Sequence, residues 1–377
     1  MALPFTPSSS LTLGVEIEVQ VIDPQTLDLT PAAPRLFSRL GDDPHIKAEL
    51  FQSMVEINTG VCRNAGEARR DLLGVMARLR WACAEEGVVL AAAGSHPFAK
   101  HRERLVYPAE RYANLIDRNA WIARRLMIFG VHFHLGMPDG ERAWQVLNGL
   151  LWYLPHLLAL SASSPFWQGS DTGLASSRIT IFEALPTAGH PCTFPDYAAF
   201  EKFYDAMIAS RGIASVKDLW WDIRPHPDYG TVEIRICDGA ATLAEAVTLA
   251  ALAHALAAKL LARVEAEGRI APPPEWILRE NKWRASRWGL DANLMLDTSG
   301  RSAPLRDEIE RLAAELEPVA RSQRALDELR GLAAMLRRPS YQRQRAVFDE
   351  QKSLEAVARA LVEEFAIEPM ATPGVAG

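Results

Sequence analysis

Residues 14–20 read GVEIEVQ, a strict alternation of apolar and polar side chains. Side chains of a β-strand point alternately to its two faces, so the stretch predicts a strand with one apolar face and one face that carries Glu16 and Glu18. Two carboxylates one pleat apart repel each other unless positive charge lies near them. The pattern therefore indicates a bound cation, with a divalent metal ion as the simplest candidate, and the alternative is a solvated edge strand with two surface glutamates.

Two later stretches, GVHFHLG and TVEIRIC, repeat the alternation with different polar residues. The first places His132 and His134 opposite an apolar face, and the second does the same with Glu233 and Arg235. If the three strands share an antiparallel sheet, their apolar faces pack on helices and their polar faces form one floor. Such a floor of carboxylates, imidazoles and a guanidinium would bind metal ions and anions.

The other elements follow from hydrophobic spacing and from Gly and Pro punctuation. Helices are predicted over 32–40, 66–86, 107–129, 141–162, 196–209, 243–267, 303–317, 322–336 and 351–366. Further strands are predicted over 27–29, 88–93 and 179–182. Because the strands alternate in polarity and lack regular βαβ spacing, an α+β fold with a mainly antiparallel sheet is favoured over a parallel one.

The 377 residues show no internal repeat and no low-complexity linker. We therefore predict a single domain over 1–377, with the sheet and its helices over about 11–300 and a helical C-terminal portion over about 301–367. The tail over 369–377 is predicted to be loose.

Composition restricts the possible partners and the compartment. The net charge of −6 argues against nucleic acid and anionic membranes as partners and favours a small substrate. Four widely spaced cysteines form no metal or disulfide motif, which is typical of a reduced cytoplasmic protein. No secretory signal precedes the first strand, and the apolar stretch over 147–162 is too short to span a bilayer.

A second acidic pair, Glu49 and Glu56, lies seven residues apart. In one helix the two side chains would share a face, whereas in one uninterrupted strand they would point to opposite faces. A bulge or bend would bring them together. Two unrelated surface glutamates are an equally good interpretation of this stretch on its own.

The other candidates also have plainer interpretations. His132 and His134 form a His-x-His pair, but no third zinc ligand motif accompanies them, and either can be a structural histidine. Glu233 beside Arg235 suits a metal ligand next to an anion clamp, or a simple cross-strand ion pair.

Two arginines occur in stretches that suggest mobile loops. Arg178 ends the Gly- and Ser-rich run over 163–178, and Arg224 precedes a proline. Mobile loops that carry arginine suit a lid over an anionic substrate, although most loop arginines are simply solvated. The sequence has no Walker-type phosphate loop and no strand-coupled GxGxxG, so a bound nucleotide would be held through metal and arginine.

Taken together, six motifs carry a resemblance to a known family. They are GVEIEVQ, AELFQSMVEINTG, GVHFHLGMP, SDTGLASSR, WWDIRPHPDYGTVEIRICD and ENKWRASRWGLDA. This set resembles the YbdK-like carboxylate-amine ligases, also called type 2 glutamate-cysteine ligases, which are similar in fold to glutamine synthetase. The resemblance spans about residues 11–365.

The resemblance implies a funnel-like, curved antiparallel sheet of about six strands with helices on its outer face. It implies a homodimeric enzyme that uses ATP and two or three Mg²⁺ ions to join a carboxylate and an amine, such as glutamate and cysteine, through an acyl phosphate. The metal-binding residues implied are Glu16, Glu18, Glu49, Glu56, His132 and Glu233. The catalytic residues implied are Arg235, Glu56 and Arg178, and the nucleotide-binding residues are Arg235, Arg224 and His134.

Two other functions remain open at this point. The same floor could activate water in a metal-dependent amidase that acts on γ-glutamyl-type amides. Alternatively, the chain could bind a nucleotide or an amino acid without catalysis. The residues leave the identity of both substrates open.

Overall fold

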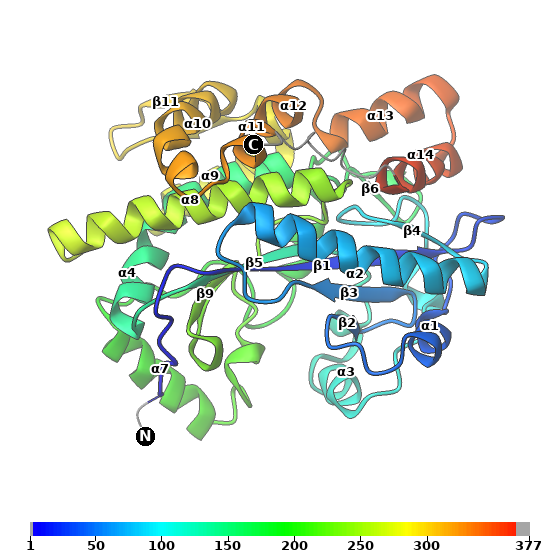
Figure 1. Cartoon of the computed structure of the whole chain (residues 1–377), viewed down its shortest axis with the longest axis horizontal. Coiled ribbons are helices and arrows are strands. Elements are labelled where there is room, and N and C mark those ends of the chain that lie inside the picture. The colour runs from blue at the N-terminus through cyan, green and yellow to red at the C-terminus, as the bar shows by residue number, and fades with distance from the viewer. Residues whose placement is uncertain (1–2, 367–377) are drawn as a thin grey trace, which may run out of the picture.

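The computed structural model describes residues 3–366, and the tail predicted over 369–377 lies outside that range. Its main sheet has seven strands, all paired antiparallel, in the order β2-β3-β1-β5-β9-β8 with β4 also beside β1 (Figure 1). The strands are β1 (Leu13–Ile22), β2 (Ile46–Ala48), β3 (Met54–Asn58), β4 (Val89–Ala91), β5 (Val131–Gly136), β8 (Ile223–His226) and β9 (Thr231–Ile234). The predicted α+β fold with an antiparallel sheet is confirmed.

The three alternating strands are neighbours in this sheet. Glu16 of β1 lies opposite His132 of β5, and His134 of β5 lies opposite Glu233 of β9. Residues directly opposite each other in a sheet point to the same face, so these side chains share one surface. The predicted polar floor is therefore present, and its register follows from the period-two alternation.

The opposite face of the sheet is apolar and is covered by two long helices, α2 (Ala65–Glu86) and α8 (Leu243–Glu267). Side chains such as Val15, Ile17 and Phe133 are buried there. Burial of each such side chain stabilises the fold by about 1.5–3 kcal/mol. By length and composition α8 could cross a membrane, but 72% of its most apolar window is buried in the structure, as in a core helix.

The ends of these two helices are set by their capping residues. Asn64 caps α2 by accepting a hydrogen bond from the Glu67 backbone N–H at 2.9 Å. The helix stops at Gly87, whose φ of +65° is a conformation that favours glycine. Thr242 caps α8 in the same way, since its hydroxyl accepts from the Glu245 backbone N–H at 3.1 Å.

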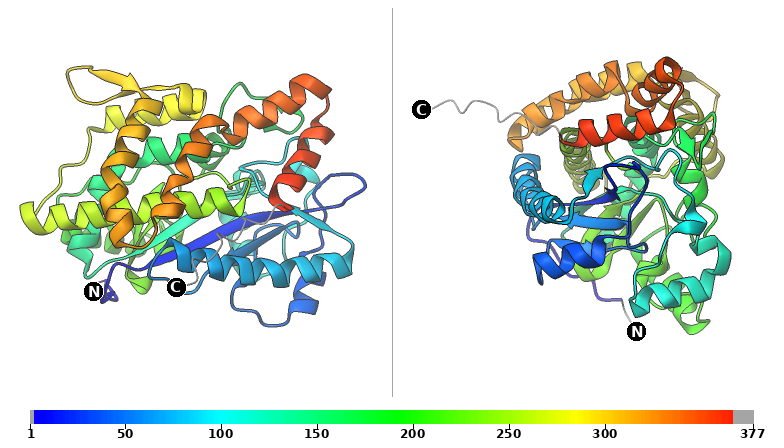
Figure 2. Two further views of the ribbon diagram at one scale, coloured as in Figure 1. Left: turned by 45° about the horizontal axis from the view of Figure 1, so that its top comes forward. Right: turned by 90° about the vertical axis from the view of Figure 1, so that its right-hand side faces the viewer.

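The remaining helices surround this core. They are α1 (Ala33–Leu40), α3 (Glu110–Ala123), α4 (Gly140–Leu150), α5 (Leu154–Ser161), α6 (Arg178–Phe182), α7 (Tyr197–Ala209), α9 (Glu275–Trp288), α10 (Leu305–Ser322), α11 (Leu326–Arg330), α12 (Leu332–Arg337), α13 (Ser340–Gln351) and α14 (Leu354–Ala366). Two short hairpins pair β6 (Phe166–Trp167) with β7 (Ser170–Asp171) and β10 (Asn293–Met295) with β11 (Ser302–Pro304). Helices α10 to α12 pack on the side of α8 that faces away from the sheet (Figures 1 and 2).

Several predicted elements differ from the structure. Residues 179–182 form the short helix α6 and not a strand, because an apolar run of four residues carries no periodicity that separates the two. The predicted return strand over 27–29 is reduced to one bridge between Ile22 and Leu29. Helices α9 and α13 were not predicted, because their many polar residues mask the apolar spacing.

Two helices are shorter than the sequence indicated. The helix predicted over 107–129 is α3, which ends at Ala123 and is interrupted at Ala120 by a φ of +48°. The helix predicted over 141–162 is divided into α4 and α5 at Leu151–Tyr153, just before Pro155. Pro155 has no backbone N–H to donate to the carbonyl of Leu151, four residues earlier, which accounts for the break in α-helical hydrogen bonding at this point.

Candidate active site

A cavity of about 440 Å³ lies against the polar face of the sheet. The helices α3 and α7 lie on this side of the sheet, below it in Figure 1. Nine of the ten residues predicted for the site line the cavity: Glu16, Glu18, Glu49, Glu56, His132, His134, Arg224, Glu233 and Arg235. Arg178, the remaining candidate, does not line it.

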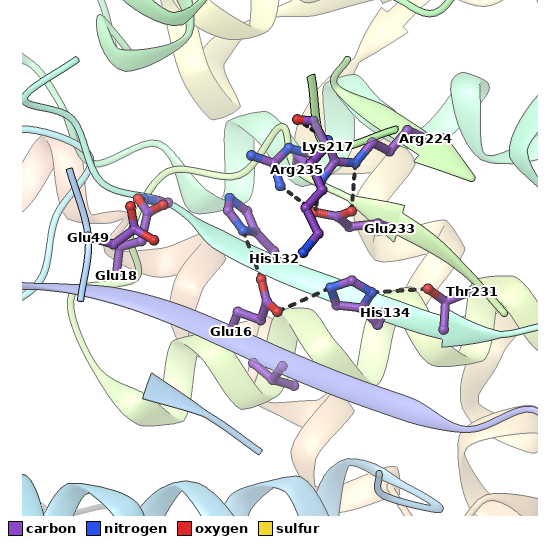
Figure 3. Close-up of polar contacts among 12 residues, drawn as sticks. Glu16, Glu18, Glu49, His132, His134, Lys217, Arg224, Thr231, Glu233 and Arg235 are labelled. Atoms are coloured by element: carbon purple, nitrogen blue, oxygen red, sulfur yellow. Dashed lines mark hydrogen bonds and ion pairs between the residues drawn. The ribbon is translucent and has the colours of Figure 1, made fainter. Parts of the chain in front are cut away.

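Glu16 lies between the two histidines of β5 (Figure 3). Its Oε2 is 3.4 Å from Nδ1 of His132, and its Oε1 is 3.4 Å from Nε2 of His134. Burial would raise the pKa of Glu16, but the hydrogen bonds and charges of both histidines hold that pKa well below its usual range. His134 is fixed from its other side, because its Nδ1 is 3.0 Å from Oγ1 of Thr231.

Glu233 is held by two buried arginines (Figure 3). Arg224 donates from Nε at 2.7 Å and from Nη2 at 3.2 Å, and Arg235 donates from Nη1. Burial would raise the pKa of Glu233, but the positive charges of Arg224 and Arg235 hold it well below its usual range. Arg224 is anchored in turn by backbone carbonyls, including those of Lys217 and Leu219 at 2.9 Å.

The second acidic pair meets across a bend and not within one element. Glu49 follows β2 and Glu56 lies in β3, and the turn between these paired strands brings both side chains to the cavity. Glu56 is directly opposite Glu18 in the sheet. Burial, followed by the charge of Glu18, raises the pKa of Glu49 to about 7. Burial and the neighbouring carboxylates, Glu16 first among them, also raise the pKa of Glu56 well above its usual range.

The residues present fit a divalent cation. Ligand atoms of Glu16, His134 and Glu233 lie within 4.8 Å of one another, a spacing that suits three ligands of one ion. Nε2 of His132 is buried without a hydrogen-bond partner in the part of the chain that the structure describes, and the near polar neighbour of Nε2 of His134 is Glu16, a candidate ligand itself. His134, predicted to bind the nucleotide, therefore also belongs to the candidate metal ligands.

The prediction that Arg178 lies on a mobile lid is wrong. Arg178 is buried at the start of α6, and its guanidinium donates to the carbonyl oxygens of Arg235 and Ile236 at 3.4 Å. A Cβ at Gly130 would come within 2.3 Å of its Nη2, so the side chain lies directly over that glycine. Buried Asp238 fixes the preceding segment by accepting hydrogen bonds from Ser163, Ser164 and Ser176.

Arg224 is not on a mobile loop either. It lies within β8 and is buried, because its partner Glu233 is on the neighbouring strand. Pro225 follows Arg224 without ending the strand. Edge strands tolerate proline, and β8 is the last strand of the sheet.

Sequence reasoning missed the basic residues of α3. Arg111, Asn114 and Arg118 line the cavity from this helix. Nη2 of Arg111 is 3.6 Å from Oε1 of Glu49, and Nη1 of Arg118 is 3.6 Å from Oδ2 of Asp218. Their spacing of three and seven residues, which places side chains on one helix face, was a signal that could have identified them.

An aromatic pair at the turn between β8 and β9 was also missed. The rings of His226 and Tyr229 are stacked, with centroids 4.1 Å apart and an interplanar angle of 3°. Both residues line the cavity, and burial lowers the pKa of His226 to about 4, so its ring is neutral. The sequence His-Pro-Asp-Tyr-Gly reads as an ordinary turn and gives no sign of this stacking.

Comparison with known proteins agrees with this arrangement. The family described as Glutamate-cysteine ligase family 2 (GCS2) matches residues 12–364. A protein of Bdellovibrio bacteriovorus named "Putative glutamate--cysteine ligase 2" is 47% identical over 96% of this chain and 97% of its own length. A protein of the same name from Thermobifida fusca is 42% identical over 97% of this chain and 93% of its own length.

Solved structures with a similar fold have little sequence identity. A glutamate-cysteine ligase of Francisella tularensis, crystallised in complex with AMP, has a TM-score of 0.68 at 13% identity and covers 97% of this chain and 91% of its own. A bifunctional glutathione synthetase of Pasteurella multocida has a TM-score of 0.66 at 14% identity, over 94% of this chain and 51% of its own. These two likenesses show the fold.

Proposed function

We propose that this chain, which belongs to glutamate-cysteine ligase family 2, uses ATP to join the carboxyl group of one amino-acid-like molecule to the amine of another. The family establishes the class of enzyme, a ligase that forms an amide bond. The identity of the two substrates and the role of each residue are part of the proposal.

The observation that supports this function best is the division of the cavity between carboxylates and arginines. Glu16, Glu18 and Glu233 lie on one floor, and the guanidinium groups of Arg224 and Arg235 lie beside them. A metal-bound triphosphate needs both kinds of group, because its cations take carboxylate oxygens and its phosphate oxygens take cationic donors.

Magnesium is the ion proposed for this floor. Glu16, His134 and Glu233 would hold one ion, and the second acidic group of Glu18, Glu49 and Glu56 would hold another, with His132 between them. Bound Mg²⁺ would neutralise part of the negative charge on the phosphate oxygens. Burial and neighbouring carboxylates raise the pKa values of Glu49 and Glu56, and too little positive charge lies near to offset them, which supports a cation site at the second group.

Arg235 is proposed to contact the transferring phosphoryl group. Glu233 orients its guanidinium through Nη1, and Nε of Arg235 is buried without a hydrogen-bond partner in the described residues. A carboxylate oxygen of the substrate would attack the γ-phosphorus of ATP, with ADP as the leaving group. The amine would then attack the resulting acyl phosphate, lose a proton and release phosphate.

The proposal also includes the domain organisation, the cellular location and the oligomeric state. We propose one catalytic domain, which is supported by one large core of buried side chains that extends from Leu13 to Phe365. A cytoplasmic location fits an enzyme that consumes ATP. A homodimer would have a surface available on α9, where Trp276 and Trp283 are exposed and two turns apart.

The experiment is an assay of ADP release with purified protein, Mg²⁺ and pairs of amino acids. We expect ADP only when a carboxylate and an amine are both present, and we expect hydroxylamine to replace the amine and give a hydroxamate from the acyl phosphate. Cleavage of γ-glutamyl amides without ATP would instead establish the amidase. Nucleotide binding without turnover across all pairs would instead establish a binding protein.

A further inference from the structure

The two ends of the cavity differ in chemistry. The part contributed by α3 carries arginines and asparagines, namely Arg111, Asn114, Arg118 and Asn119, and Arg111 lies 3.6 Å from Glu49 beside β2, the edge strand opposite β8. The other end carries the stacked rings of His226 and Tyr229, which belong to the turn between β8 and β9. Charged and amide side chains suit the charged groups of an amino acid, whereas a planar aromatic surface suits a nucleobase.

Tyr229 differs from the other aromatic side chains that line the cavity because it is 54% exposed. The ring beneath it, His226, is only 2% exposed, so the pair presents a single outer ring supported by a buried one. An exposed aromatic ring inside a cavity is costly to leave in water and is therefore a candidate binding surface.

The turn that carries Tyr229 is held in one conformation. Gly230, directly after it, has a φ of +65°, and a Cβ at this position would come within 1.6 Å of the carbonyl oxygen of Thr6. The Thr6 backbone N–H also donates to the carbonyl of Pro227 at 2.9 Å. The N-terminal segment therefore fixes the turn, so the ring is already in place before a ligand binds.

The stacked pair lies next to the candidate metal ligands. The ring of His134 is 5.6 Å from that of Tyr229 and 5.8 Å from that of His226, both tilted by 63°. Nε2 of His134 points away toward Glu16, where the first ion is proposed. A ligand whose flat end covers Tyr229 would therefore extend its other end toward Glu16 and Glu233.

From these contacts we infer that Tyr229, backed by His226, is the stacking surface for the base of the nucleotide, and that the amino-acid substrate enters at the α3 end. This inference rests on the proposed function, because it takes the ligand to be a nucleoside triphosphate. It fixes the direction of that ligand in the cavity, with the base at the turn between β8 and β9 and the phosphates over the floor.

The test compares ligands that share the triphosphate but differ in the base. We would measure the dissociation constants of ATP and of inorganic tripolyphosphate, each with Mg²⁺, by calorimetry on the full chain. Tyr229→Leu removes the ring, and Tyr229→Phe keeps it. We expect Tyr229→Leu to raise the dissociation constant of ATP about tenfold and to change that of tripolyphosphate by no more than about twofold. We expect Tyr229→Phe to bind both ligands like the unaltered chain.

A matched control is Trp121→Leu, which removes an aromatic ring that is 63% exposed but does not line the cavity. We expect it to change neither constant. Unchanged ATP binding in Tyr229→Leu would overturn the inference, and so would an equal loss for tripolyphosphate. Because these readouts are of binding, they are separate from the ADP-release assay, whose failure would count against the ligase and not against the stacking surface.

Discussion

The cavity holds two groups of glutamates on one sheet face, and the groups differ in what surrounds them. Glu16 and Glu233 are surrounded by histidines and arginines, and their pKa values are held well below the usual range. Glu49 and Glu56 face other carboxylates, and their pKa values are raised. We call these the compensated pair and the uncompensated pair.

The difference shows that the position of a carboxylate in the sheet matters more than its residue type. The compensated pair lies on or beside β5 and β9, whose neighbours supply cationic side chains from within the chain. The uncompensated pair lies at the β2–β3 end, where the main cationic neighbour is Arg111 at 3.6 Å from Glu49. The first pair is therefore ready to hold a ligand, and the second requires a cation from outside.

The largest expected effect is on the compensated pair. Glu233→Gln would leave Arg224 and Arg235 buried without their counter-charge, so we expect a loss of about 3–5 kcal/mol in the free energy of unfolding. We expect ADP formation to fall by at least about 100-fold. Urea denaturation and a coupled ADP assay would measure the two effects.

Glu16→Gln is the matched variant for this prediction. Its partners His132 and His134 can become neutral, so we expect it to lose only about 1 kcal/mol of stability while it also loses ADP formation. Equal stability losses in the two variants would contradict the assignment of Glu233 as the anchor of two buried charges.

The second prediction concerns the dependence of stability on pH. His96 lies outside the cavity, and its protonation would add to any pH dependence that arises from the floor. Burial lowers the pKa of His96 to about 4, and its Nδ1 accepts a hydrogen bond from the Ala99 N–H at 3.1 Å, which requires the neutral ring. Because the folded pKa is below the unfolded value near 6.5, stability should fall as the pH drops from about 6.5 to about 4. We expect a loss of about 3 kcal/mol over this range.

Unfolding by urea at a series of pH values would measure this dependence. His96→Asn keeps an acceptor for the Ala99 N–H but cannot be protonated, so its stability should be flatter over the same range. The same slope in both proteins would show that the acid sensitivity arises elsewhere, for instance on the floor itself.

The smallest expected effect is on the uncompensated pair and has the opposite sign. Glu56→Gln removes a charge whose folded pKa is raised, so at pH 8 without metal we expect the variant to be more stable by about 1 kcal/mol. We also expect Mg²⁺ to raise its melting temperature less than that of the unaltered chain. Thermal unfolding with EDTA and with Mg²⁺ would measure both.

Glu265→Gln is the control. Glu265 is exposed on α8, so this substitution removes the same charge at a position away from the cavity. We expect it to leave both melting temperatures nearly unchanged. Destabilisation by Glu56→Gln in EDTA would show that Glu56 is compensated after all, and the distinction between the two pairs would no longer hold.

Much of the floor could be predicted because it depends on local alternation. The period of two places Glu16, Glu18, His132, His134 and Glu233 on polar faces whatever the rest of the chain does. The antiparallel class followed from the same alternation. Long helices with clear stops, such as α2 and α8, were also predicted to within a residue or two.

The errors arose where the outcome depends on distant partners. Arg178 reads as a loop arginine, yet Asp238, sixty residues later, gathers its segment into the core. Arg224 reads as part of a proline-rich loop, yet pairing with β9 makes it a buried strand residue. In each case hydrogen bonds to a residue outside the local stretch outweighed its local preference, sixty residues away for Arg178 and on the next strand for Arg224.

The sequence by itself determined which side chains share a face of each strand, because alternation is a property of the extended backbone. Only the tertiary structure decided which carboxylates are compensated, because charge compensation acts across space between strands that are far apart in the chain. Glu16 meets His132 across 116 residues, whereas Glu18 meets Glu56 and shares its cavity with Glu49. The same local pattern therefore produced two electrostatically different ends of one site.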